Sequence, residues 1–210
     1  MATNADTRPQ ASSSGKEIPN IKVYERTLST EYNIYLPDII RSDSTTFLDV
    51  FNILSTATAD DEINIHMANY GGSVQTGFRL ARNIKNCAAP VIMRIEGNCY
   101  SMGAILALCG NGLAITTGTE LMFHNFSAVH EGKGSELNLS IEATTRHFVS
   151  NLRLFCMPFL TSKEVTHIMN DQDLYIEAGT KEFLQRIERH FGVKKRAKKC
   201  NPEKPSLPSI

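Results

Sequence analysis

The sequence predicts an α/β fold with a largely parallel β-sheet. Short apolar segments of strand length alternate along the chain with longer segments whose apolar residues recur every three or four positions. Two glycine-bearing turns, at residues 70–73 and 100–103, each follow a predicted strand and precede a predicted helix. Strands that alternate with helices are joined by right-handed crossovers and lie mostly parallel in one sheet.

The first half of the chain contains three predicted strands and two predicted helices. Residues 1–20 are small and polar and contain Pro9 and Pro19, so we expect a disordered tail. Alternating apolar residues predict strands, and apolar residues at helical spacing predict helices. In chain order these elements are a strand at 32–36, a helix at 45–56, a strand at 62–68, a turn at 69–73, a helix at 74–86 and a strand at 91–96.

The second half begins with a helix of small apolar residues after Ser101, which a glycine-rich stop at 110–112 ends. Gly132 and Gly134 mark a flexible break, and Thr161 begins a capping box. The predicted elements are strands at 113–116 and 120–124, a long helix at 135–155, a helix from 161 to about 169, a connection at 171–176 and an amphipathic helix at 180–191.

The long helix at 135–155 lies outside the alternation of strands and helices. Its apolar stripe predicts a projecting element that buries this face on another subunit, and the alternative is an ordinary core helix. The stripe consists of Leu137, Ile141, Phe148, Leu152 and Phe155. We expect one domain over residues 21–192, followed by a basic, proline-containing tail over 193–210.

Composition restricts the class of protein. The formal net charge is zero, and the lysine-rich run at 194–199 is interpreted as a solvated tail, so a nucleic-acid partner is not expected. The five cysteines are scattered and form no metal-binding pattern, which is typical of reduced thiols in the cytoplasm. The sequence lacks both a secretory signal and an apolar run of the ~20 residues that span a membrane. We therefore expect a cytoplasmic protein without a metal or membrane anchor.

Ser101 is the first candidate for chemistry. It stands where a buried strand turns into a helix, beside main-chain N–H groups that have no partner within the helix. A serine nucleophile needs such donors, because they stabilise the oxyanion formed on attack. The alternative is that Ser101 only caps the helix.

His124 is the candidate base, because it ends a strand that reaches the same edge of the sheet. His130 is its rival. An aspartate must orient the imidazole, and both Asp171 and Asp173 are suitably placed by sequence.

At this point the chain resembles the proteolytic subunit of the Clp protease, the ClpP-like serine peptidases. Four motifs carry the resemblance in the same order over residues 32–178. They are Gly71-Gly72-Ser73-Val74 with Gly77, Tyr100-Ser101-Met102-Gly103-Ala104, Met122-Phe123-His124, and Asp173-Leu174-Tyr175-Ile176 with Ala178.

The resemblance implies a role for each site residue. Ser101 is the nucleophile, His124 the base and Asp173, rather than Asp171, the third member of the triad. The main-chain N–H groups of Gly72 and Met102 form the oxyanion hole. The implied fold is the ClpP/crotonase-like one, with repeated β-β-α units and a projecting handle helix.

The implied function is a serine endopeptidase that hydrolyses unfolded polypeptides inside stacked rings, as a tetradecamer fed by an AAA+ unfoldase. ATP would be used by that partner, and no cofactor is expected in this subunit. Tyr70 replaces the family's usual proline, and Tyr100 its usual alanine, so the resemblance implies a divergent member, phage- or plastid-like rather than a housekeeping enzyme. The alternatives are a crotonase-like acyl-CoA enzyme, a phage head-maturation or assembly protease, and a catalytically silent ring subunit.

Overall fold

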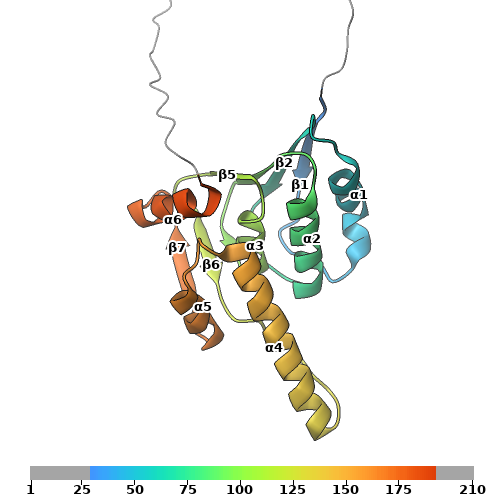
Figure 1. The fold of residues 1–210 in the computed structure, drawn as a ribbon, viewed down its shortest axis with the longest axis vertical. Coiled ribbons are helices and arrows are strands. Elements are labelled where there is room, and N and C mark those ends of the chain that lie inside the picture. The colour runs from blue at the N-terminus through green and yellow to red at the C-terminus, as the bar shows by residue number, and fades with distance from the viewer. Residues whose placement is uncertain (1–28, 193–210) are drawn as a thin grey trace, which may run out of the picture.

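The computed structural model describes residues 29–192, so the expected tails at 1–20 and 193–210, with the basic run at 194–199, lie outside the described residues. None of the helices within this range is both long enough and apolar enough to cross a membrane. The elements (Figure 1) are β1 (Glu31–Tyr35), η1 (Ser44–Phe47), α1 (Leu48–Thr56), β2 (Glu62–Met67), α2 (Val74–Asn86), β3 (Val91–Ile95), β4 (Cys99–Tyr100), α3 (Met102–Ala107), β5 (Gly112–Ile115), β6 (Glu120–Phe123), α4 (Gly134–Cys156), α5 (Ser162–Met169), β7 (Leu174–Glu177) and α6 (Lys181–Phe191).

The strands form two sheets. The first has the order β1-β2-β3-β5 and is parallel throughout, with α1 and α2 side by side against it (Figure 1). The second has the order β4-β6-β7, in which β4 and β6 are parallel and β6 and β7 antiparallel. The predicted α/β fold with a mostly parallel sheet is therefore confirmed, and β7 is its antiparallel exception.

The predicted connection at 171–176 is wrong in its second half, because β7 begins at Leu174. Only Ile176 of β7 is buried, and the segment has too short an apolar pattern to predict a strand. Its strand conformation depends on pairing with β6, which places Leu174 opposite Phe123. The two-residue strand β4 was missed for the same reason.

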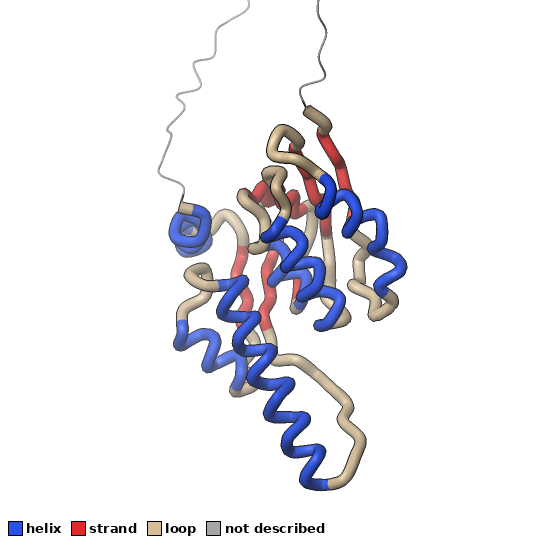
Figure 2. The backbone as a smooth tube through the Cα atoms, turned by 45° about the vertical axis from the view of Figure 1, so that its right-hand side comes forward, coloured by secondary structure: helices blue, strands red, loops and turns tan. Residues whose placement is uncertain are grey.

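The long helix α4 projects from the body of the domain, as predicted (Figure 1). Figure 2 shows the segment between β6 and α4 running out to the tip of this helix. The expectation that its whole stripe covers another subunit is wrong for the second half, because Phe148, Leu152 and Phe155 are buried within the chain. Phe148 lies 5.1 Å from Phe126 and 6.0 Å from Phe78 between ring centroids. Only the first half, with Ile141 exposed, remains free for a partner.

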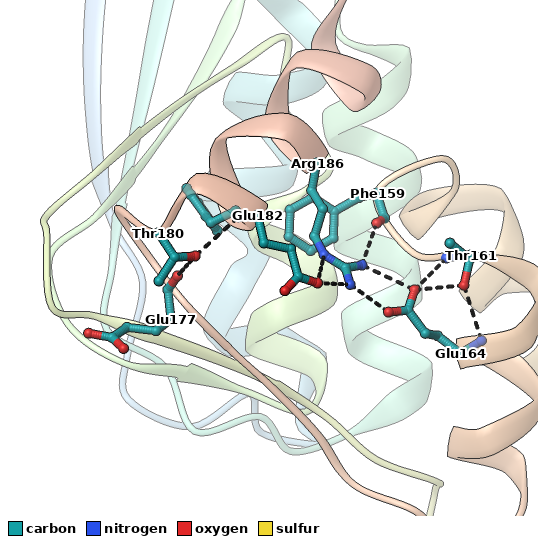
Figure 3. Close-up of polar contacts among 8 residues, drawn as sticks. Phe159, Thr161, Glu164, Glu177, Thr180, Glu182 and Arg186 are labelled. Atoms are coloured by element: carbon teal, nitrogen blue, oxygen red, sulfur yellow. Dashed lines mark hydrogen bonds and ion pairs between the residues drawn. The ribbon is translucent and has the colours of Figure 1, made fainter.

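An ion-pair cluster fixes the C-terminal helix to the domain (Figure 3). Arg186 of α6 is buried and donates to the Phe159 carbonyl at 3.0 Å and to the Glu164 carboxylate of α5 at 3.1 Å. Glu182, one turn before Arg186, accepts from the same guanidinium. A capping box between Thr161 and Glu164 holds the Glu164 carboxylate in place, so the predicted box is confirmed.

Glu164 makes the cluster sensitive to acid. Burial by itself would raise the pKa of this carboxyl, but hydrogen bonds from Arg186 and Thr161 lower it from an ordinary 4.5 to about 2. Because the folded value lies below the unfolded one, the stabilisation is complete above about pH 5 and is lost as the pH falls towards 2.

Glu164→Gln should therefore lower the free energy of unfolding at pH 7 by about 2–3 kcal/mol, because the buried Arg186 guanidinium loses a negatively charged partner. Glu182→Gln is the matched control, and the loss of this exposed partner should cost less than about 1 kcal/mol. Urea unfolding followed by circular dichroism at pH 7 and pH 3 measures both. Equal losses in the two variants at pH 7 would contradict the prediction.

Candidate active site

Ser101 lies at the junction between β4 and α3, where its main-chain N–H donates to the Met122 carbonyl at 2.7 Å. Its φ of 55° and ψ of −122° are unusual for a residue with a side chain. Strained strand-to-helix turns of this kind expose a nucleophile in α/β-hydrolases. The hydroxyl forms no capping bond to α3, so the alternative that Ser101 only caps the helix finds no support in the geometry.

The two predicted turns touch each other at this point. Gly71 has a φ of 98°, and a Cβ atom placed on it would lie 2.7 Å from the Cβ of Ser101. Such close backbone approach is open only to glycine. The turn at 70–73 therefore supplies one wall of the space around Ser101.

Asn69 joins the two turns and was not anticipated. Its buried side-chain oxygen accepts from the Gly71 N–H at 2.8 Å, and its amide donates to the Pro37 carbonyl at 2.6 Å. Its own carbonyl accepts from the Tyr100 N–H at 2.9 Å. The sequence signal was an asparagine that ends a strand two residues before a glycine, because this residue type often bonds the main chain two positions on.

Two main-chain N–H groups at these turns have no hydrogen-bond partner among the described residues. Ile40 pairs with the turn through the Gly71 carbonyl and the Ser73 N–H, which leaves out the N–H of Gly72. Met102 is the first residue of α3, so its N–H has no partner within the helix. Within residues 29–192 neither N–H donates a hydrogen bond.

A pocket of about 270 Å³ gathers these groups. Ser101, His124 and the two residues with free N–H groups, Gly72 and Met102, all line it. The rest of its wall is mostly apolar or aromatic and comes from the turn before α2, from α2, α3, α4 and β6, and from the segment after β6. These residues are Tyr70, Val74, Ile105, Phe123, Phe126, Ser127, Phe148 and Leu152.

His124 reaches the pocket because it directly follows β6, whose neighbour β4 leads to Ser101. The rival His130 lies elsewhere. It lines an adjoining hollow against α4, and its Nδ1 lies 2.9 Å from the Ser140 hydroxyl. His124, and not His130, thus lines the same pocket as Ser101.

Asp173 directly precedes β7 and is not bonded to His124. The register of the antiparallel pair ends at Phe123 and Leu174, and His124 and Asp173 are the next residues beyond it. Asp173 is exposed and lines a separate shallow hollow, and no hydrogen bond joins His124 to either aspartate within the described residues. Asp171 instead accepts from the Asn125 amide at 2.9 Å.

The remaining titratable groups add no second nucleophile to this turn. Burial raises the pKa of the Cys99 thiol to about 11, so this thiol stays protonated. Among residues 29–192, no group of three or more His, Cys, Asp or Glu side chains is arranged to hold a metal ion.

Comparison with known proteins gives one finding. The family model described as Clp protease matches residues 14–175, which include both glycine-bearing turns, His124 and Asp173. No curated protein matches the chain.

Proposed function

Because the chain belongs to the Clp protease family of peptidases, we propose that it is a serine endopeptidase with Ser101 as its nucleophile. The observation that carries this proposal is the Ser101 turn itself. A hydroxyl without a capping role stands in a strained conformation, in one pocket with a histidine and two free N–H groups.

The mechanism follows from these positions. The Ser101 hydroxyl attacks the peptide carbonyl while His124 takes its proton, and the N–H groups of Gly72 and Met102 stabilise the oxyanion. His124 then gives the proton to the departing amine. In the second half of the reaction His124 takes a proton from water, which attacks the acyl group, and returns it to Ser101 as the acyl group leaves.

Asp173 would orient the imidazole of His124. His124 directly follows and Asp173 directly precedes the last antiparallel pair, Phe123–Leu174, which brings both residues to the same end of β6 and β7. Asp171 is already engaged by Asn125. This difference supports Asp173 as the third member of the triad.

The pocket also suggests the class of residue that precedes the cleaved bond. Val74, Ile105, Phe126 and Leu152 give it an apolar wall. A volume of about 270 Å³ is large enough for one sizeable side chain. We therefore expect cleavage after large apolar residues, which unfolded polypeptides expose and folded ones bury.

Assembly into stacked rings, and feeding by an AAA+ unfoldase, belong to the same proposal. The exposed apolar residues near the tip of α4 support the ring contact, because Leu139 is 67% and Ile141 45% exposed. Apolar side chains exposed on a projecting helix favour burial against another subunit.

Leu139→Glu combined with Ile141→Glu should give smaller particles that are still folded, because these side chains make no contribution to the core. Leu184→Glu, an exposed apolar position on α6, is the matched control and should leave the particle size unchanged. Sedimentation velocity and circular dichroism decide the matter. Large particles in the double variant would remove this part of α4 from the interface.

Labelling by a fluorophosphonate probe tests the proposed function directly, since the probe needs an activated serine. We expect modification at Ser101, located by mass spectrometry, together with degradation of an unfolded protein substrate. Turnover of an acyl-CoA without labelling would favour the crotonase-like alternative. A folded protein with neither activity would be a silent subunit.

A further inference from the structure

Asn69 lies just after β2, and all of its polar groups have partners although the residue is fully buried. Its main-chain N–H donates to the Asn98 carbonyl at 3.1 Å, and its carbonyl accepts from the Tyr100 N–H at 2.9 Å. Its side-chain oxygen accepts from the Gly71 N–H, and its amide donates to the Pro37 carbonyl. Asn69 therefore ties its own turn to two other segments of the chain.

Asn69 and Ile40 together restrict Gly71, which has a φ of 98°. Glycine has more conformational freedom than any other residue, so a turn with two successive glycines needs outside contacts to hold one shape. Asn69 holds the Gly71 N–H, and the Ile40 N–H donates to the Gly71 carbonyl at 2.7 Å. The peptide groups on both sides of the Gly71 Cα atom are therefore fixed.

The direction of the Gly72 N–H follows from this arrangement. In a trans peptide the C=O and N–H bonds point in opposite directions, so the Gly72 N–H points away from Ile40, which holds the Gly71 carbonyl. Gly72 lines the Ser101 pocket, whereas Asn69 does not. Asn69 can therefore influence a reaction in the pocket only through the groups that it holds.

Asn69 also contacts the turn that carries Ser101. A Cβ atom placed on Gly103, the second residue of α3, would overlap with the Asn69 carbonyl oxygen and lie 2.8 Å from its side-chain oxygen. The start of α3, where the Met102 N–H has no partner within the helix, therefore packs directly against Asn69. One residue thus connects the two candidate donors of the oxyanion hole.

We propose that Asn69 is a positioning residue for the oxyanion hole, because its side chain holds the Gly71-Gly72 turn at a fixed place beside the start of α3. It thereby sets the Gly72 N–H relative to the Met102 N–H before substrate binds. This inference rests on the proposed serine peptidase function. Donors that are oriented in advance stabilise an oxyanion most, and a misplacement of about 1 Å can cost about 10²-fold in rate.

The test compares Asn69→Ala and Asn69→Ser in the full-length protein, with a fluorogenic peptide that has leucine before the cleaved bond. Alanine removes the acceptor of the Gly71 N–H, whereas serine keeps a weaker one. We expect kcat to fall about 10²-fold in Asn69→Ala and about tenfold in Asn69→Ser, with KM within about twofold of the unaltered value.

Asn64→Ala is the matched control. Asn64 lies on β2 and is as buried as Asn69, but its side chain bonds Glu31 of β1 and Arg94 of β3. Its loss removes a comparable set of buried hydrogen bonds away from the Ser101 pocket. The control should therefore leave kcat unchanged, and urea unfolding followed by circular dichroism shows which variants are folded in the assay.

Two inhibitors separate positioning from general damage to the pocket. A peptide aldehyde that ends in leucine forms a tetrahedral adduct with the Ser101 hydroxyl, and its oxygen occupies the oxyanion hole. The corresponding peptide alcohol binds without an adduct. In the Asn69 variants the inhibition constant of the aldehyde should rise by the factor by which kcat/KM falls, and that of the alcohol should stay the same. Equal weakening of both inhibitors would overturn the inference.

The remaining outcomes are equally distinct. If Asn69→Ala does not fold, the expected tenfold fall in Asn69→Ser and its match with the aldehyde carry the test. A folded Asn69 variant with the kcat of Asn64→Ala would overturn the inference, while hydrolysis by the unaltered protein leaves the peptidase function standing. Absence of both fluorophosphonate labelling and hydrolysis in the unaltered protein would overturn both proposals.

Discussion

Replacing Ser101 by alanine is expected to lower kcat for peptide hydrolysis by about 10⁶-fold, the size found when a catalytic serine is removed from another serine protease. The hydroxyl forms no capping bond, and alanine retains the Cβ atom that contacts the Gly71 turn. The fold and the particle size should therefore stay the same. Hydrolysis of a fluorogenic peptide and labelling by a fluorophosphonate measure the loss.

Ser127→Ala is the matched control, because Ser127 lines the same pocket but lies in the segment after β6. It should remain labelled and within a few-fold of the unaltered activity. Turnover by Ser101→Ala at a comparable rate would contradict the assignment of the nucleophile, and the hydroxyl of Ser127 would then be the next to examine.

Asp173→Asn is expected to lower kcat by about 10⁴-fold, as loss of the orienting carboxylate does in the best-studied triad. An amide still fits the exposed position directly before β7, but it no longer stabilises the imidazolium or fixes its tautomer. Steady-state kinetics on the fluorogenic peptide measure the loss, and circular dichroism checks that β7 is retained.

Asp171→Asn is the control for the aspartate. Asp171 accepts from the Asn125 amide, and its φ of 59° is one that asparagine tolerates well. Activity should change by no more than a few-fold. Reversed phenotypes, with Asp171→Asn inactive and Asp173→Asn active, would show that the resemblance selected the wrong carboxylate.

Much of the fold follows from local patterns. The strands at 62–68 and 91–96 and the helix at 74–86 were predicted within a residue or two, because each has a clear apolar period. The same patterns place Ser101 at a strand-to-helix turn and bring Gly71 to it, since parallel strands end at one edge of a sheet. These are features that neighbouring residues determine.

The parts that could not be predicted depend on contacts distant in sequence. β7 has only a short apolar pattern, and its register with β6, which brings Asp173 and His124 to the same end of the pair, is formed across about 50 residues of chain. The stripe of α4 looks uniform in sequence, yet Phe148 meets Phe78 and Phe126 while Ile141 meets no core. Periodicity identifies an apolar face, but only tertiary packing shows what covers each part of it.

The division of α4 has a mechanical consequence. Phe148 and Leu152, in the C-terminal half of α4, line the Ser101 pocket. Ile141 is exposed and lies about 10 Å from Phe148 along the axis of the same helix. An α-helix transmits displacement along its axis because its turns are hydrogen-bonded to one another. We therefore expect that a neighbouring subunit which displaces the exposed half of α4 also displaces Phe148 and Leu152, and so changes the shape of the cavity in which substrate side chains rest.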